Sequence, residues 1–382
     1  MLNIISLFIA LFISVTMKVC ILNMVGNFNK ALGQGTQRTS FELWAHIKPL
    51  SVEQGIDIDR VEIGIPGSET MRKISFTAMM PLHSFSKYDI VHLLIPIPHV
   101  PRAGRHTKIL TTVNEFGQFD KGSPAEKILA PPLAIKPKKD VKSLIMGHVN
   151  MSIADQIRKS DYMGVNSRQT LEEAVKWGYP RERIFIINHG VDERFLTKTP
   201  KKPKGGFRVG FIGALNPRKN ISFAIEAFRH VKATDATFEI WGNRNSQYEA
   251  LVEQAKGDPR IKFMGFAPED AIVSIYDRFD AFAFPSVYEG FGLPIIEAQS
   301  RALPVILYKK GKIPQETRKH CFEANDEKDM ARIIDRLARD GYSKKEQKAA
   351  TDYARGFTRQ KEALRTLEVY REIEFKVPEV ER

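Results

Sequence analysis

The sequence predicts an α/β protein built from two doubly wound, Rossmann-like domains that face each other across a cleft. The chain has 382 residues, which is too long for one ordinary core and suits two domains. Short apolar runs alternate with longer amphipathic ones, are interrupted at residues 197–206, and then restart. Buried strands that alternate with helices are typical of a parallel sheet covered on both faces.

The first half of the chain supplies strands with few polar interruptions. Helical patterns separate them, the clearest at residues 36–48 and 167–177. We therefore place an N-terminal domain at residues 17–196. Its predicted strands are residues 18–24, 89–94, 108–113, 162–166 and 184–188.

A linker follows at residues 197–206, TKTPKKPKGG, where two prolines, two glycines and four lysines offer nothing to bury. A second domain is expected at residues 207–358. The last stretch, roughly 359–375, is a charged amphipathic helix with no strand after it. The strands predicted in the second domain are residues 207–212, 238–241, 261–264, 281–284 and 304–308.

The start of the chain is unusual, because residues 2–16 are almost wholly apolar and uncharged. They are few for a membrane span, and they lack the basic region and cleavage site of a signal peptide. Met17 then opens a segment that reads as a buried first strand. A misassigned start at Met17, an interfacial anchor and a signal peptide are the three interpretations, in that order.

The amino-acid composition indicates the class of protein and the cellular compartment. The chain is 43% hydrophobic and 10% aromatic, which is typical of a well-packed globular protein and not of a disordered or fibrous one. Cys20 and Cys321 are far apart and show no spacing of a disulfide framework or zinc site. A reducing cytoplasm is therefore the expected location.

The charge is basic, with 58 Lys and Arg against 45 Asp and Glu and a net charge of +13. Residues 101–145 concentrate the excess, with nine basic residues against four acidic ones. No nucleic-acid-binding signature accompanies them, so we expect no nucleic acid partner. A merely solvated surface is the commoner explanation of such a charge, and docking at an anionic membrane surface, on the inner face, is the functional one. The basic residues include Lys136, Lys138, Lys139 and Lys142.

The most informative segment is SVYEGFGLPIIEA, residues 286–298, which follows a predicted strand. Pro294 suits the first position of a helix, and Gly290 and Gly292 let the main chain approach a ligand closely. Free amides at the helix start would bind an anion. Glu289 before the helix and Glu297 within it could face one ligand from two sides. The alternative is a tight turn with surface carboxylates.

This segment resembles the EX7E signature of retaining GT-B glycosyltransferases, the "glycosyl transferases group 1" family. The two glutamates have the right spacing, with GFGLP between them and PS before them. The likeness extends through residues 207–330 and, more loosely, through residues 160–195, where NHGVDERF resembles a family stretch. It implies transfer of a hexosyl group from a nucleotide-sugar donor with retention of configuration, without a metal or other cofactor.

The resemblance also assigns roles. It implies that Glu289 contacts the donor sugar and that Glu297 binds the ribose. Amides around Phe291, Gly292 and Leu293 would meet the sugar and the pyrophosphate. The C-terminal domain would hold the nucleotide and the N-terminal domain the acceptor, a lipid-linked or cell-envelope glycan. The final helix, residues 359–382, would cross back to the N-terminal domain.

A second candidate site is FIGALNPRKN, residues 211–220. A strand, Gly213, and then Arg218 and Lys219 at a helix start would place two cations and several amides beside a diphosphate. A basic helix cap on the surface is the alternative. The family commonly has an arginine directly after this glycine. Ala214 stands there instead, so Arg218 is expected to substitute, while Lys219 matches the family's lysine.

The N-terminal domain offers weaker signals. Gly33 and Gly35 follow the first strand and match a family loop near the donor phosphate. His92 lies where the family often has histidine, and a buried structural histidine explains it equally well. Leu94 stands where many relatives have a further histidine. Residues 113–115, Val-Asn-Glu, replace the family's Val-His-Asp, so the acceptor-side catalytic group stays open.

Residues 57–59, Asp-Ile-Asp, spell the metal motif of the other major glycosyltransferase fold, and we interpret the match as chance. A nucleotide-sugar epimerase on the same fold and a non-catalytic sugar-nucleotide-binding protein are the alternative functions. The EX7E signature argues against the epimerase, and the missing acceptor-side histidine keeps the binding protein open.

Overall fold

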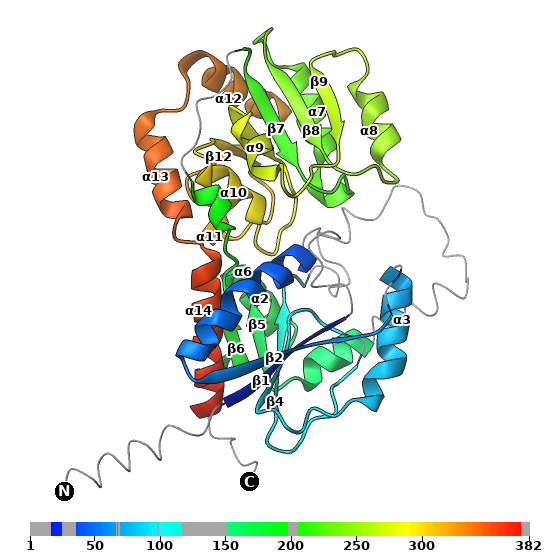
Figure 1. Ribbon diagram of the computed structural model, residues 1–382. Helices are drawn as coiled ribbons and strands as arrows, with labels where there is room; N and C mark the ends of the chain where they lie inside the picture. The colour runs from blue at the N-terminus through cyan, green and yellow to red at the C-terminus, as the bar shows by residue number, and fades with distance from the viewer. Residues whose placement is uncertain are drawn as a thin grey trace, which may run out of the picture.

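The computed structural model describes residues 17–24, 36–65, 67, 69–97, 99–116, 152–197 and 205–375. It contains two six-stranded sheets, and every strand pairing within them is parallel. Figure 1 shows the sheets one above the other, each in its own domain. The predicted pair of doubly wound α/β domains is confirmed.

The N-terminal sheet has the strand order β2-β1-β3-β4-β5-β6. Its central strands are buried on both faces, as expected for a covered parallel sheet. Its strands are β1 Met17–Met24, β2 Ile56–Ile63, β3 Ile90–Leu93, β4 Lys108–Val113, β5 Tyr162–Val165 and β6 Ile184–Ile186. Its helices are α2 Thr36–Glu53, α3 Glu69–Met79 and α6 Arg168–Lys176, with short 3-10 turns η2 Met80–Leu82, η3 Arg181–Arg183 and η4 Glu193–Leu196. Residues 152–159 are also helical.

The C-terminal sheet has the order β12-β11-β10-β7-β8-β9. Its strands are β7 Arg208–Ile212, β8 Thr237–Trp241, β9 Ile261–Gly265, β10 Ala281–Phe284, β11 Val305–Tyr308 and β12 Phe322–Ala324. Its helical elements are η5 Pro217–Lys219, α7 Ile221–Arg229, α8 Tyr248–Ala255, α9 Ile272–Asp277, α10 Leu293–Ser300, α11 Gln315–Arg318, α12 Glu327–Asp340 and α13 Lys344–Ala354. One continuous core of buried side chains joins both faces of this sheet.

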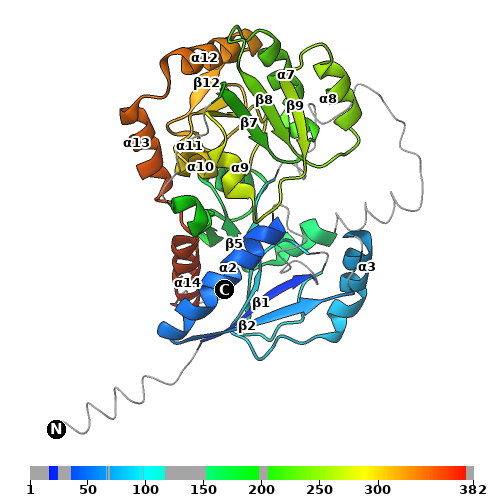
Figure 2. The ribbon, with the colours of Figure 1, turned by 45° about the horizontal axis from the view of Figure 1, so that its top comes forward.

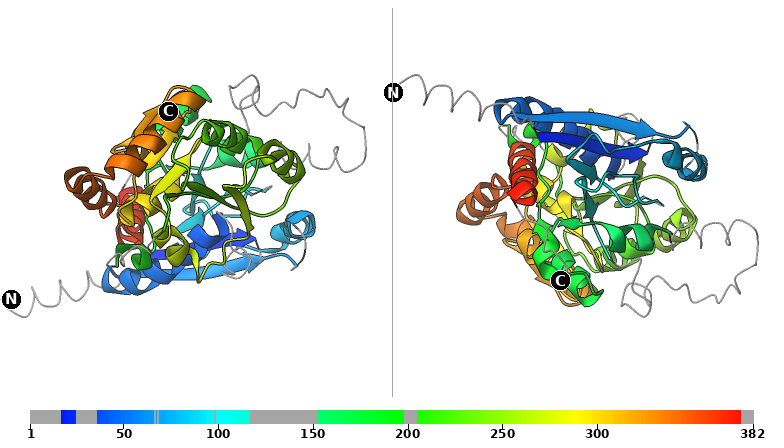
Figure 3. Two further views of the ribbon diagram at one scale, coloured as in Figure 1. Left: turned by 90° about the horizontal axis from the view of Figure 1, so that it is seen from above. Right: turned by 90° about the horizontal axis from the view of Figure 1, so that it is seen from below.

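Helix α14, Arg359–Phe375, returns from the second domain and packs on the first. It lies beside α2 in the views from above and below (Figure 3). Leu367, Tyr370 and Ile373 are buried in the N-terminal core. The chain therefore crosses twice between the domains, once before β7 and once before α14.

The two crossing segments run side by side as a short parallel bridge. The amide of Val191 donates to the carbonyl of Phe357 at 2.9 Å, and the amide of Arg359 donates to the carbonyl of Val191 at 3.2 Å. A Cβ at Gly190 would stand 2.1 Å from the carbonyl carbon of Thr358. Only glycine allows the two segments this approach.

The residues Asp57 and Asp59 lie within β2, an edge strand beside β1 (Figure 2). Strands β2 and β12 and helix α3 were not predicted. β2 reads IDIDRVEI, whose charged side chains face outward at the sheet edge, so it lacks the uninterrupted apolar run of a central strand. The predictions for residues 2–16, for Gly33 and Gly35, for Lys136, Lys138, Lys139 and Lys142, and for linker residues 198–204 lie outside the described residues.

Candidate active site

The loop between β10 and α10 carries the segment that the sequence singled out, at the carboxyl edge of the second sheet. Gly292 has φ of 88°, in the left-handed region that glycine adopts without a steric cost. Pro294 lies in the first turn of α10, where its missing N–H costs nothing. Ligands of doubly wound sheets bind at this edge, so the loop stands where a ligand site is expected.

At the end of this loop, four consecutive main-chain amides donate to no described group, whereas the carbonyls beside them are occupied. In the part of the chain that the structure describes, the N–H groups of residues 290–293 donate no hydrogen bond. A run of free amides at a helix N-terminus favours an anion. The carbonyls of residues 289, 290 and 291 accept from the side chains of Gln169 at 2.9 Å, Ser167 at 2.7 Å and Thr317 at 2.6 Å.

Glu289 is buried in a cluster of charges. Its Oε1 lies 2.7 Å from Nζ of Lys219, its Oε2 lies 3.3 Å from Nη1 of Arg218, and its side chain is 6% exposed. Burial alone would raise the pKa of Glu289, but Lys219 and Arg218 outweigh it and lower that pKa below its ordinary value. The carboxylate is therefore ionised at neutral pH.

The two cations respond differently to the same surroundings. Burial is the largest influence on Lys219 and lowers its pKa, although Glu289 acts in the opposite sense. Burial would also lower the pKa of Arg218, but Glu289 and Glu115 raise it. Arg218 thus stays charged in all conditions of interest.

Turn η5 positions both cations. It follows β7 and Gly213, and the side chain of Asn216 caps it by accepting from the amide of Lys219 at 3.2 Å. The turn ends at Lys219, and Asn220 after it has φ of 52°, in the left-handed region. The carbonyl of Arg218 accepts from the amide of Val287 at 2.9 Å, so the loops after β7 and β10 are tied together. The structure therefore brings the two predicted segments into one site.

Glu115 reaches this cluster from the other domain. It follows β4 in the N-terminal sheet, and its Oε2 lies 3.0 Å from Nη1 of Arg218. The sequence signal that could have found it is its place two residues after a strand, at the carboxyl edge where ligands bind. No candidate role was given to it from the sequence.

Gly290 serves a contact that the sequence did not predict. A Cβ there would stand 1.8 Å from the carbonyl oxygen of Asn114. We expected this glycine to admit a ligand, and in this structure it admits the main chain of the opposite domain. Asn114 in turn receives a hydrogen bond from Asn166 at 2.9 Å and lies 3.0 Å from Nε2 of His189.

Glu297 lies on α10 and is 2% exposed. Its Oε2 accepts a hydrogen bond from the hydroxyl of Tyr276 at 2.8 Å. Glu289 is thus held by cations and Glu297 by a buried hydroxyl group. The ribose role of Glu297 stays a prediction.

His92 is buried and lies under α14. Its two ring nitrogens are hydrogen-bonded to the hydroxyls of Tyr370 at 2.7 Å and Thr112 at 2.8 Å. Burial lowers the pKa of His92 to about 3, so the ring is neutral. These contacts support the structural explanation of this histidine.

Asp59 of the Asp-Ile-Asp motif accepts a hydrogen bond from Tyr88 at 2.8 Å. Asp57 lies 3.9 Å from Nζ of Lys48. Among the described residues, no group of three or more His, Cys, Asp and Glu side chains could hold a metal ion. No described helix is long and apolar enough to cross a membrane.

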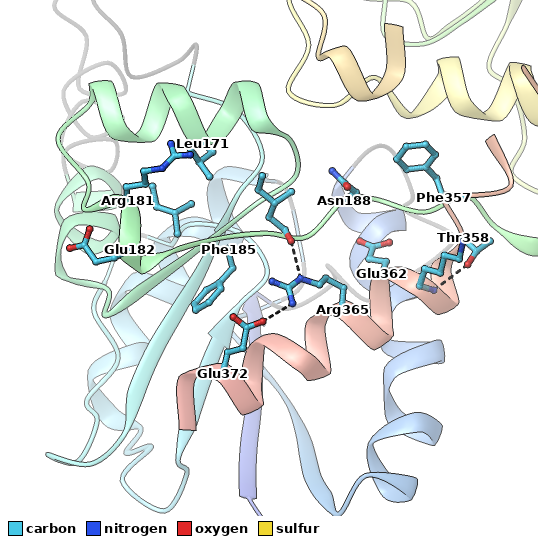
Figure 4. A pocket seen from close by; sticks show the side chains of 14 residues that line it. Leu171, Arg181, Glu182, Phe185, Asn188, Phe357, Thr358, Glu362, Arg365 and Glu372 are labelled. Atoms are coloured by element: carbon cyan, nitrogen blue, oxygen red, sulfur yellow. Dashed lines mark hydrogen bonds and ion pairs between the residues drawn. The ribbon is translucent and has the colours of Figure 1, made fainter. Parts of the chain in front are cut away.

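A cavity of about 750 Å³ lies apart from the cluster, between β6, η3 and α14. Figure 4 shows Phe185, Phe357 and Arg365 on its wall, with Arg365 bound to Glu372 of its own helix. None of the candidate site residues lines this cavity. The chemistry indicated by the sequence therefore belongs to the loops after β7 and β10.

Comparison with known proteins gives consistent results. Residues 192–357 match the family described as "Glycosyl transferases group 1". The chain is 26% identical to O-antigen chain mannosyltransferase B of Escherichia coli over 155 residues, 36% of this chain and 40% of that protein. It is also 26% identical to the putative colanic acid biosynthesis glycosyltransferase WcaL of Escherichia coli K12 over 182 residues, 45% of each chain. The matched region spans less than half the length of these curated relatives.

Solved structures match over nearly the whole chain. A glycosyltransferase from Rickettsia africae has a TM-score of 0.62 at 17% identity, covering 95% of this chain and 100% of that one. Anabaena HepE in complex with UDP and glucose has a TM-score of 0.60 at 16% identity, covering 93% of this chain and 100% of that one. These likenesses show the GT-B fold. Within that fold, residues 192–357 form the part of the chain that belongs to the glycosyl transferases group 1 family.

Proposed function

We propose that the protein is a retaining glycosyltransferase that moves a hexosyl group from a nucleotide-sugar donor to an acceptor glycan. The observation that carries this is the run of amides at residues 290–293, which donate to no group among the described residues, in the loop that ends beside Arg218 and Lys219. Amides and cations together form a site for a diphosphate. Family membership supports the reaction class.

Each residue of the cluster has a role in this proposal. Arg218 and Lys219 stabilise the negative charge that develops on the departing diphosphate, in place of a metal ion. Glu289 contacts the donor sugar, which gains positive character as the diphosphate leaves. Departure and attack by the acceptor hydroxyl take place on one face of the sugar, which retains the configuration.

The acceptor is proposed to be a cell-envelope glycan, lipid-linked or polymeric. The support is the similarity to proteins described by their roles in O-antigen and colanic acid synthesis. The N-terminal domain would hold the acceptor and the C-terminal domain the nucleotide.

Nucleotide binding tests the proposal directly. Glu297→Gln keeps the shape of the side chain but removes the charge expected to hold the ribose. A hydrogen bond to a charged group contributes about 1.5–3 kcal/mol, so affinity for the nucleoside diphosphate should fall by about 10- to 150-fold. UDP and GDP are titrated against the parent and the variant by calorimetry, and the nucleotide that binds the parent is used throughout.

Tyr276→Phe is the matched control. It removes the hydroxyl that donates to Glu297 but leaves the carboxylate in place. Its melting temperature should fall while its nucleotide affinity stays within about twofold of the parent value. A Glu297→Gln protein that binds nucleotide like the parent would refute the ribose site. If neither UDP nor GDP binds the parent, the proposed function itself fails.

Kinetics separate the alternative functions. The transferase releases nucleoside diphosphate from its donor in an acceptor-dependent manner. An epimerase would release it with donor and water alone, and a binding protein would release none.

A further inference from the structure

One ion pair in the candidate site joins the two domains. Arg218 belongs to the C-terminal domain, Glu115 belongs to the N-terminal domain, and Nη1 of the arginine lies 3.0 Å from Oε2 of the glutamate. The same Nη1 lies 3.3 Å from Oε2 of Glu289 and donates to the carbonyl of Tyr288 at 3.3 Å. The guanidinium that should meet the donor's diphosphate is therefore already occupied by carboxylates.

The charges of the cluster cancel. Arg218 and Lys219 supply two cationic groups, and Glu115 and Glu289 supply two carboxylates. A diphosphate is strongly anionic, so it gains little electrostatic free energy on binding to a site without net charge. Its binding becomes favourable when one of the two carboxylates moves away from the cations.

Exposure decides which carboxylate leaves. The side chain of Glu289 is 6% exposed and contacts both cations. The side chain of Glu115 is 36% exposed and contacts Arg218. Water can solvate Glu115 again when it is released, whereas release of Glu289 would leave a buried charge uncompensated. Glu115 is therefore the group that a diphosphate displaces.

We propose that Glu115 occupies Arg218 in the donor-free protein as an internal substitute for the diphosphate, and that the donor releases it to bind the acceptor's hydroxyl. The inference rests on the proposed function and deepens it. An ionised carboxylate only accepts hydrogen bonds, so it can orient a hydroxyl group once Arg218 no longer holds it. Glu115 comes from the domain proposed to hold the acceptor, and it shares Nη1 of Arg218 with the carboxylate proposed to contact the donor sugar.

An order of binding follows from this exchange. Before the donor arrives, Glu115 is bound to the opposite domain and is unavailable to the acceptor. After the donor arrives, the arginine binds phosphate and the glutamate is free. Glu115 is thus a positioning residue that couples donor binding to acceptor binding.

Glu115→Gln tests the exchange, because it keeps the size of the side chain and removes the competing charge. Affinity for UDP or GDP, whichever binds the parent, should rise by about 3- to 10-fold. The gain should shrink at high salt, since Glu115 is partly exposed and its ion pair is screened. Calorimetry at two salt concentrations measures both effects.

Glu173→Gln is the matched control. Glu173 also joins the domains, because it accepts a hydrogen bond from Tyr288 at 2.6 Å and pairs with Lys312, but it makes no ion pair with Arg218. Its loss should leave nucleotide affinity within about twofold of the parent value. Tighter binding in both variants would mean that a loosened interface, and not the competing charge, is responsible, and would overturn the proposal.

Steady-state kinetics supply a second test. In Glu115→Gln the Michaelis constant should fall for the donor and rise for the acceptor, whereas general damage to the fold would not move the two in opposite directions. Glu115→Asp restores the charge and should recover part of the acceptor effect. If the parent binds nucleotide and Glu115→Gln binds it no more tightly, the exchange is wrong while the proposed function stands.

Discussion

At the scale of single residues, the buried ion pair between Glu289 and Lys219 governs what the site can bind. Each side chain is at most 10% exposed, and their charged atoms lie 2.7 Å apart. Two charges removed from water in this way are tolerated because each compensates the other. A ligand that enters must therefore exchange charges with this pair.

Glu289→Gln should separate chemistry from binding. It removes the charge proposed to face the donor sugar, so turnover should fall by about 10²- to 10³-fold. Free nucleoside diphosphate should bind at least as tightly as to the parent, because one negative charge has left the cluster. Nucleotide release from the donor and calorimetry with free nucleotide measure the two quantities.

Two results would count against this assignment. Turnover equal to that of the parent would remove Glu289 from the chemistry. Nucleotide affinity that falls together with turnover would place it in general donor binding. The melting temperature of each variant is recorded, since Lys219 loses its charged partner.

At the scale of elements, a buried polar contact joins β3 to α14. The ring of His92 and the hydroxyl of Tyr370 are 278 positions apart in the sequence and 2.7 Å apart in space. Both side chains are fully buried, and apolar residues of α14 surround the contact. The contact therefore favours one rotation and register of the returning helix on the N-terminal domain.

Tyr370→Phe should destabilise the fold without affecting the site. The buried histidine loses one hydrogen-bond partner, so the free energy of unfolding should fall by about 1–3 kcal/mol. Nucleotide affinity should stay unchanged, because α14 contributes none of the candidate site residues. Urea unfolding and calorimetry provide the measurements.

Tyr342→Phe is the control for this experiment. Its ring packs on Phe322 and is partly exposed, and the described residues give its hydroxyl no hydrogen bond. The change should cost less than about 0.5 kcal/mol. An equal decrease in the free energy of unfolding of the two variants would show that the hydrogen bond to His92 does not stabilise the fold.

At the scale of the whole molecule, a buried charge network secures the two crossings between domains. Arg359 is fully buried and pairs with Glu42 and Glu362, each at 2.6 Å. Glu362 also accepts from the amide of Gly190 at 3.0 Å and contacts His189 at 2.8 Å. The network therefore holds the chain where it leaves the first domain and where it returns.

Acid should weaken this network. Burial would raise the pKa of Glu362, but Arg359 and His189 outweigh it and lower the pKa from 4.5 to about 2. A carboxyl group with a lowered folded-state pKa stabilises the fold above its unfolded value, and the stabilisation is lost as the pH falls through the folded value. The free energy of unfolding should fall by about 3 kcal/mol from this group between pH 4.5 and 2.

Glu362→Gln should flatten the pH dependence of stability in that window, although its stability at pH 7 is lower. Glu368→Gln on the same helix is the control, because Glu368 is 62% exposed and its profile should follow that of the parent. Urea unfolding at several pH values gives the curves. Parallel curves for the parent and Glu362→Gln would show that the network does not carry the acid response.

Much of the fold could be predicted from the sequence. The central strands of both sheets were found because buried parallel strands are short apolar runs, and β10 was placed with its observed bounds. The edge strands β2 and β12 were not found, since one alternates charged and apolar residues and the other has three residues. Their pairing depends on a neighbouring strand and not on their own composition.

The candidate site, too, could be predicted only in part from the sequence. The segments around Glu289 and Arg218 could be identified because glycines, a proline and charged residues follow a strand there, and because the segment around Glu289 resembles the EX7E signature. The pairing of each cation with its carboxylate could not be predicted from these local patterns. The roles given to Gly33 and Gly35 stay predictions, as does the ribose role of Glu297.

By itself, the sequence determined that this chain forms two parallel α/β domains and which loops carry the proposed phosphate-binding residues, because both follow from local periodicity and residue type. The tertiary structure alone decided that Glu115 faces Arg218 across 103 positions of sequence, and that Gly290 receives the main chain of Asn114. These contacts depend on how the two domains meet. Their geometry is set by packing over the whole interface, which no short segment encodes.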